Sequence, residues 1–280
     1  MWRIFGGACI VFAVALTAYA VSDASEIGIG INYNWWAFTR MSLHDCRAQD
    51  QPRTVPQWIL PAYDRVPVRH AVREQLTKMR RAGFASLRII VFYGHDTRPD
   101  PSAFTSLTGD VKPADRMKLA NFVGDIARAG FRSLEVVPDF GAENALFCRN
   151  RQWGDCFDPR RIGENWRFIA QVSQTAIAAA GRMRVRVDIA NEKAPDPAMP
   201  AATLQRAKTY LQTIAGRFQR RFGARWLVSV ARSGHSDPVE TSNRLNLLAA
   251  DLAEARLVPK FLELHEYSDD PQDVQESLDA

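Results

Sequence analysis

Apolar and polar residues alternate along several short runs of this chain, most clearly at residues 184–190. Val185, Val187 and Ile189 alternate there with polar or small residues. A period of two predicts a β-strand whose two faces differ. The run ends in the polar pair Asn191-Glu192, and two prolines soon afterwards disfavour regular structure. We therefore expect a carboxamide and a carboxylate at the tip of a strand.

Similar runs recur along the chain, and most are followed by a longer stretch with helical periodicity. The expected strands cover residues 27–33, 86–92, 133–138, 184–190, 226–231 and 260–267. The expected helices cover residues 68–82, 114–129, 163–180, 202–222 and a stretch that ends near 255. Residues 34–66 contain several prolines and are expected to be irregular. The chain thus contains about six strand–loop–helix units.

Regular alternation of strands and helices predicts an α/β protein with a mostly parallel sheet. Such a sheet is either open and doubly wound or closed into a TIM-type (β/α)8 barrel. No glycine-rich phosphate loop follows the first strand, as a dinucleotide-binding open sheet would need. The long connections follow strands, whereas those after helices have only a few residues. This asymmetry favours a barrel over residues 21–280, with about six of the eight units present.

The strand periodicity also predicts which side chains enter the barrel. If Glu192 faces the barrel mouth, alternation turns the valines of its strand outward against the helices. The same rule places five charged residues inside, namely Arg88, Glu135, Arg186, Asp188 and Glu263. Buried charges must be paired, because each unpaired one costs roughly several kcal/mol. The mixture of two arginines and three acids makes such pairing feasible.

The composition is that of an ordinary globular protein, and it limits the partners. The formal net charge of 280 residues is +5. The basic residues are spread over helices instead of forming one run, so we expect solvated helix faces and no nucleic-acid surface. An acidic polysaccharide is the weaker alternative partner. No cofactor is expected.

The N-terminus has the pattern of a secretory signal peptide over residues 1–20. Arg3 precedes an apolar run, and Ala18-Tyr-Ala20 fits the small-x-small cleavage pattern. The apolar run is too short for a comfortable membrane span. We therefore expect a secreted or periplasmic protein without stable membrane insertion, with an uncleaved anchor as the alternative.

Three cysteines would remain after cleavage, and export permits disulfides. Cys148 and Cys156 flank a short polar loop and are the expected pair. Cys46 is then unpaired, or it replaces one of them. A zinc site is less favoured, because no histidine lies at ligand spacing near these cysteines.

Polar residues at the ends of several expected strands form an ordered pattern. Arg88 lies on the second strand, Asn191-Glu192 ends the fourth, and His265 and Tyr267 end the sixth. Trp35 and Trp36 follow the first. This order resembles the clan of retaining glycoside hydrolases with a (β/α)8 barrel, which includes family 5 cellulases and mannanases and family 39 enzymes. The resemblance covers the chain from residue 21 onward by order of elements, although each motif is short.

The resemblance implies a role for each of these residues in cleaving a β-linked polysaccharide. Glu192 would be the general acid/base, and Asn191 would bind the sugar 2-hydroxyl. Arg88 would keep the nucleophile ionised, while His265 and Tyr267 would position it and a sugar hydroxyl. Trp35 and Trp36 would stack on sugars, with buried packing as the alternative. Asp139, at the tip of the third strand, completes the expected substrate-binding set.

Two departures from the clan leave alternatives open. Lys193 stands where the clan usually has proline, which affects only the local loop. The clan carries its nucleophile on strand seven, whereas about six strands are counted here. The chain is therefore a piece of a longer enzyme, or Glu266 lies on strand seven and is the nucleophile, or the protein binds glycans without cutting them.

A metal-dependent barrel hydrolase is a further alternative to glycosidase chemistry. Histidine and aspartate occur near several strand tips, at His95, Asp96, Asp139, His235, Asp237 and His265. They lack the close His-x-His pairing expected on strand one of such enzymes. The sequence therefore favours a glycosidase without a bound metal.

Overall fold

The computed structural model describes residues 30–40, 54–95, 103–106, 108–140, 159–191, 195, 197, 200–233, 238–257, 259 and 261–267. The expected signal peptide, the three cysteines that follow it and Glu192 lie outside these ranges. No helix among the described residues is both long and apolar enough to cross a membrane.

The main element is a parallel sheet whose strands follow one another in chain order. Its path runs through β1 (Gly30–Asn32), β4 (Ser86–His95), β6 (Ser133–Phe140), β7 (Arg184–Asp188), β8 (Trp226–Ser233) and β9 (Phe261–Tyr267). Every neighbouring pair along this path is parallel. A further short strand, β5 (Ala103–Ser106), pairs with the C-terminal part of β4. The alternation predicted from the sequence is therefore confirmed as an α/β fold.

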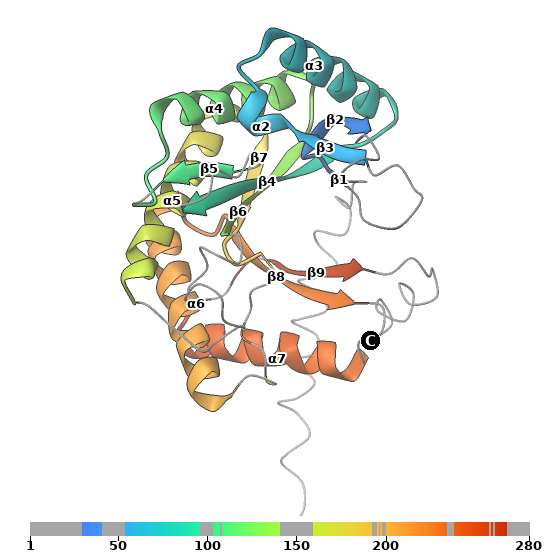
Figure 1. Cartoon of the computed structure of the whole chain (residues 1–280). Helices are drawn as coiled ribbons and strands as arrows, with labels where there is room; N and C mark the ends of the chain where they lie inside the picture. The colour runs from blue at the N-terminus through green and yellow to red at the C-terminus, as the bar shows by residue number, and fades with distance from the viewer. Residues whose placement is uncertain are drawn as a thin grey trace, which may run out of the picture.

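Five long helices connect successive strands of the path. They are α3 (Val66–Arg81), α4 (Pro113–Arg128), α5 (Pro159–Ala179), α6 (Ala201–Phe222) and α7 (Pro238–Glu254). Crossovers between parallel strands are almost always right-handed, and the strand order here never reverses, so the helices are expected on one side of the sheet. Figure 1 shows this arrangement: the helices form an outer arc, and the strands lie on its inner side.

The outward face of the sheet forms the hydrophobic core with the helices. Ile89 of β4, Val136 of β6, Val187 of β7 and Val228 of β8 are at most 1% exposed and belong to one core cluster. Their alternate neighbours face the other way, and Arg88, Glu135 and Arg186 are register partners on adjacent strands. The predicted separation of an apolar outer face from a charged inner face is thus confirmed for these strands.

The structure differs from the sequence prediction in the segment that follows β1. Residues 34–66 were expected to be irregular, yet β2 (Trp35–Arg40) pairs antiparallel with β3 (Thr54–Trp58), and the short helix α2 (Ile59–Ala62) follows. Pro56 lies within β3, which pairs only with β2 among the described residues. Proline is tolerated on such an edge because its missing N–H need not serve a second neighbour.

A buried carboxylate joins helices α3 and α4. Asp125 of α4 accepts hydrogen bonds from the Tyr63 hydroxyl (2.7 Å) and from Nε of Arg69 (2.9 Å), and it forms ion pairs with Arg73 and Arg128. Burial raises the pKa of Asp125, but these donors outweigh it and hold the pKa well below the usual range. The carboxylate therefore stays ionised, and its bonds connect α3 with α4.

Candidate functional site

Arg88 lies at the centre of a polar network on the inner face of the sheet. Its Nε donates to Oε1 of Glu135 at 2.7 Å, and its Nη2 donates to Oδ1 of Asn191 at 2.8 Å. The third nitrogen, Nη1, donates to Oδ1 of Asn32 at 3.2 Å. The planar guanidinium can hold several acceptors at fixed angles. Arg88 thereby connects β1, β4, β6 and the tip of β7.

Asn191 contacts two of the other residues that were predicted for the site. Its Nδ2 donates to Oδ2 of Asp139 at 2.9 Å, while its Oδ1 accepts from Arg88. Arg88, Asp139 and Asn191 were each predicted as site residues, and the structure brings all three together. The side-chain amide of Asn191 is oriented by a donor on one side and a carboxylate on the other.

The backbone at Asn191 adopts a conformation that non-glycine residues rarely use. Its φ is 39°, in the left-handed region where asparagine is better tolerated than most residues. Oδ1 of Asp188 accepts the backbone N–H groups of Ala190 (3.1 Å) and Asn191 (2.9 Å). These bonds hold the turn directly before Glu192. Unusual backbone held by its surroundings is enriched at functional sites.

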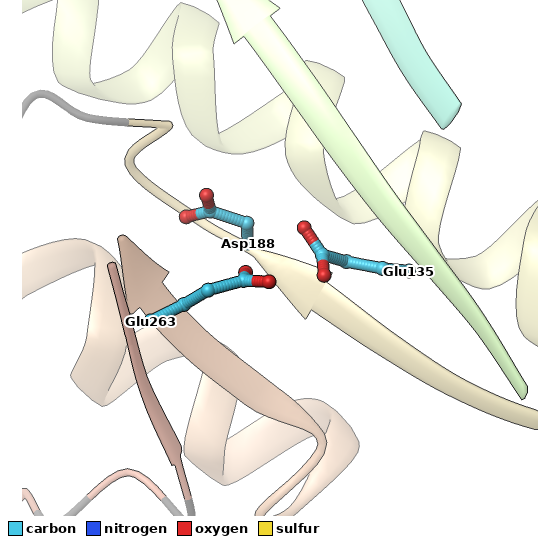
Figure 2. Close-up of side chains that lie close together, drawn as sticks. All are labelled: Glu135, Asp188 and Glu263. Carbon is cyan, nitrogen blue, oxygen red and sulfur yellow. The ribbon is translucent and has the colours of Figure 1, made fainter. Parts of the chain in front are cut away.

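Three carboxyl groups meet beside this network. One oxygen from each of Glu135, Asp188 and Glu263 lies within 4.8 Å of the others. Figure 2 shows the carboxyl groups of Glu135 and Glu263 pointing toward one another, with Asp188 beside them. The three residues come from β6, β9 and β7. Asp188 is fully buried, and its Oδ2 accepts a hydrogen bond from the Ser229 hydroxyl. The inner-face acids predicted from the sequence therefore form one cluster.

Burial and mutual repulsion change the protonation of this cluster. Burial first, and then the charges of Glu263 and Asp188, raise the pKa of Glu135 to about 8, against the lowering effect of Arg88. Burial likewise raises the pKa of Asp188, although Ser229 and two backbone N–H groups oppose it. At neutral pH the cluster thus retains protons. Its oxygens are also of the kind that bind hard divalent cations, so these residues could hold a metal ion.

The remaining predicted site residues are placed only in part. Trp35 and Trp36 lie in β2, and His265 and Tyr267 lie in the last half of β9, opposite Ala231 and Ser233. The side-chain positions of these four residues are outside the described part of the structure, as is Glu192. Their contribution to the site therefore stays a prediction.

Asn32 and Ser229 belong to the network but were not singled out from the sequence. Each occupies an inward position of its strand, since Asn32 is the register partner of Arg88 and Ser229 that of Glu263. Strand alternation in an otherwise apolar run could have identified Ser229. The short first strand, with its glycines, offers no comparable signal for Asn32.

The comparisons with known proteins include a distant structural similarity but no match in sequence. No family model matches the chain, and no curated protein matches its sequence. Among solved structures, xylanase B from Clostridium stercorarium F9 is similar with a TM-score of 0.45 and 12% sequence identity. The similarity covers 93% of this chain and 69% of that chain. A similarity at this level establishes no family for the chain.

Proposed function

We propose that the chain is a glycoside hydrolase of the (β/α) barrel type that cleaves a β-linked polysaccharide with retention. The observation that carries the proposal is the hydrogen bond between Arg88 on the second strand of the path and Asn191 at the tip of the fourth. The resemblance inferred from the sequence requires these two residues at one site. Consecutive parallel strands that never reverse in order also suit a barrel better than a doubly wound sheet.

The proposed mechanism assigns the acid/base role to Glu192. Protonated Glu192 would donate to the leaving glycosidic oxygen and then, as a carboxylate, activate water in the second step. Asn191, held by Arg88 and Asp139, would present its amide to the sugar 2-hydroxyl. That contact would strengthen in the oxocarbenium-like transition state, so orienting the amide in advance would lower the barrier.

Arg88 has the position needed to stabilise negative charge at the site. It donates to Glu135 and Asn191 and is only 12% exposed. In the proposed enzyme its charge would favour the ionised form of a carboxylate nucleophile beside Asn191. The described residues do not assign that nucleophile. Trp35, Trp36, His265 and Tyr267 complete the proposed substrate site.

Secretion belongs to the same proposal. An exported enzyme would reach polysaccharides outside the cytoplasm, and a Cys148–Cys156 bridge would stabilise the loop between β6 and α5 there. Non-reducing mass mapping of the secreted protein would detect this bridge.

Substitution of Glu192 by Gln tests the acid/base assignment. The variant should hydrolyse oligosaccharides at least about 1,000-fold more slowly, because the leaving oxygen then lacks a proton donor. Aryl glycosides with very acidic leaving groups should be affected far less in the first step. Steady-state rates on both substrate types measure the difference. Glu254→Gln, on the exposed end of α7, is the matched control and should keep the original rates.

Equal rates for the wild type and Glu192→Gln on both substrates would exclude the acid/base role. A second candidate function is glycan binding without cleavage. The Arg88–Asn191–Asp139 network favours it, because these side chains could bind sugar hydroxyls whether or not a nucleophile lies beside them. Glu266 lies on β9, the sixth strand of the path among the described residues, whereas the clan carries its nucleophile on the seventh. Oligosaccharide binding by calorimetry, with no turnover by the wild type, would support this second function.

A further inference from the structure

The N-terminal ends of the strands carry a concave, arginine-rich surface on the opposite side from Asn191. Two shallow pockets that are open to solvent lie there, one of about 750 Å³ and one of about 340 Å³. They share the lining residues from Gly181 to Arg184, so they are adjacent, and we call the two together the basic groove. It lies at the N-terminal ends of β6, β7 and β8 and beside the C-terminal end of α5.

The charge of the basic groove is strongly one-sided. Its described lining contains the arginines Arg128, Arg132, Arg182, Arg184, Arg186 and Arg225, and none of the described lining residues is acidic. Arg128 pairs with Asp125, and Arg186 lies over the ring of Phe261 at 3.7 Å. Arg132, Arg182 and Arg225 are exposed, and none of them has a side-chain ion pair within the described part of the chain. These three are therefore available to bind an anion.

The sheet arranges these cations in a row. Arg132 precedes β6, and its carbonyl accepts the N–H of Arg184 at the start of β7. The carbonyl of Arg225, just before β8, accepts the N–H of Val187 in β7. Adjacent strands lie about 4.8 Å apart, so the backbone positions of Arg132, Arg184 and Arg225 follow one another from strand to strand. A linear polyanion could contact several of these arginines at once, which multiplies weak individual contacts.

We infer that the basic groove binds an anionic polysaccharide carrying carboxylate groups, such as a polyuronate. Arginine binds carboxylates in a bidentate, planar geometry, so several arginines together suit a chain that carries a carboxylate on successive units. The exposed large apolar residues of the described part are Val66, Met117 and Leu262. None of them lines the groove, so a bilayer would find no apolar anchor there.

The same composition disfavours single-stranded nucleic acid as the occupant. Such binding uses exposed aromatic rings on which bases stack. The aromatic residues of the groove are Phe131 and Trp226, which are 4% and 1% exposed, and Phe261, which is covered by Arg186. The groove therefore offers charge and shape without stacking platforms. This site is independent of the proposed catalytic site at the other end of the strands.

Calorimetric titration of the whole chain with polygalacturonate tests the inference. Binding should occur, weaken steeply with added salt, and fall at least about tenfold in the triple variant Arg132→Gln/Arg182→Gln/Arg225→Gln. The matched control is Arg65→Gln/Arg116→Gln/Arg206→Gln, which removes the same charge from exposed positions near the N-terminal ends of α3, α4 and α6. The control should bind within about twofold of wild type.

The alternative occupants are tested with the same proteins. A neutral polysaccharide, a single-stranded oligonucleotide and phosphatidylglycerol vesicles should each bind the wild type at least about tenfold more weakly than polygalacturonate. Equal loss of binding in both triple variants, no loss in the groove variant, or preference for the oligonucleotide or vesicles would overturn the inference. If circular dichroism shows that the groove variant is unfolded, Arg182→Gln alone replaces it, with Arg116→Gln as its control and a loss of at least about threefold expected.

Discussion

At the scale of single residues, the most unusual group is the carboxyl of Glu135. It is paired with Arg88, yet it also lies against two other acids in a site from which water is largely excluded. An arginine would ordinarily lower the pKa of its carboxylate partner. Here burial and the neighbouring acids prevail and raise it. Glu135 on the inner face therefore keeps its proton at pH values at which exposed carboxyl groups are already ionised.

This raised pKa predicts a specific dependence of stability on pH. In the unfolded chain Glu135 releases its proton near pH 4.3, whereas in the folded protein it does so near pH 8. The folded state therefore binds more protons between these values, and the free energy of unfolding should fall as the pH rises from about 5 to about 8. Glu135→Gln should remove most of this fall.

Urea unfolding of both proteins at several pH values measures the effect. Gln retains an acceptor oxygen for Arg88, so the geometry of that contact is disturbed little at low pH. Glu254→Gln, on an exposed helix end, should leave the pH dependence unchanged. If the free energy of unfolding of Glu135→Gln fell with rising pH as steeply as that of the wild type, the prediction would be contradicted.

Several residue placements were predictable because strand alternation is a strong constraint. Once Arg88, Glu135 and Asp188 were assigned to strands, their common face followed from the period of two. Their contacts did not, because the partner of each charge depends on the stagger between strands, which no local pattern encodes. The side-chain bonds from Asp188 to the backbone of Ala190 and Asn191 are similarly a property of the folded turn.

At the scale of elements, the packing of one loop against α5 depends on a glycine. Gly109 has a φ of +81°, and its N–H donates to the Tyr93 hydroxyl at 3.1 Å. A Cβ at this position would lie 2.1 Å from the backbone carbonyl oxygen of Glu164 in α5. Because that obstacle is backbone, it cannot move aside as a flexible side chain would. The loop before α4 can therefore approach α5 only without a side chain here.

Gly109→Ala should consequently destabilise the protein by about 3 kcal/mol, through steric overlap added to the cost of a positive φ. Gly83→Ala is the matched control, since Gly83 has a φ of +96° but no atom within 4 Å of the position that a Cβ would occupy. It should cost only about 1 kcal/mol. Chemical denaturation of the two variants gives both values, and equal losses would show that the contact with α5 is unimportant.

Element boundaries were predicted well where helix periodicity was strong and poorly where short strands occur. The helices α3, α4 and α6 match their expected ranges within two residues. The strands β2, β3 and β5 were missed, because none of them shows a clear alternation of apolar and polar residues. Asp139 was expected directly after the third strand, which was predicted to end at Pro138, but it lies within β6, which continues to Phe140.

At the scale of the whole molecule, the sheet is narrowest between β7 and β8. Eight residue pairs join β4 to β6 and seven join β8 to β9, but only two join β7 to β8. The unit β8–α7–β9 is therefore attached to the rest of the sheet by few backbone hydrogen bonds. Local opening follows such weak connections.

We expect amide hydrogen exchange in β8 and β9 to be faster than in β4 and β6, by about tenfold or more. Peptides from the two strand pairs can be compared by mass spectrometry in the same protein. Peptides from α4 and α7 serve as the helical controls for each unit. Equal protection of both strand pairs would show that helix packing, and not strand pairing, determines which unit opens.

The expectation of a barrel rests on the long βα loops and short αβ connections in the sequence, and it stays a proposal, whereas the α/β class is confirmed. The structure supplies the parallel pairing and the strict order of six strands, which loop lengths alone do not determine. The basic groove could not have been anticipated, since its arginines come from several separate connections and meet only in the folded sheet. The sequence shows which charges lie close together along the chain, but not which charges from separate connections come together in the folded sheet.

The order of the strands has a consequence for how the protein is made. Each strand of the path pairs with the strand of the path that is synthesised before or after it, although β2, β3 and β5 emerge in between. The sheet can therefore grow by addition of one unit at a time as synthesis proceeds, from β1 toward β9, without waiting for a distant partner. During that growth the newest strand always has one unpaired edge. Until it is covered, that edge is the place where a nascent chain would be vulnerable to pairing with another copy.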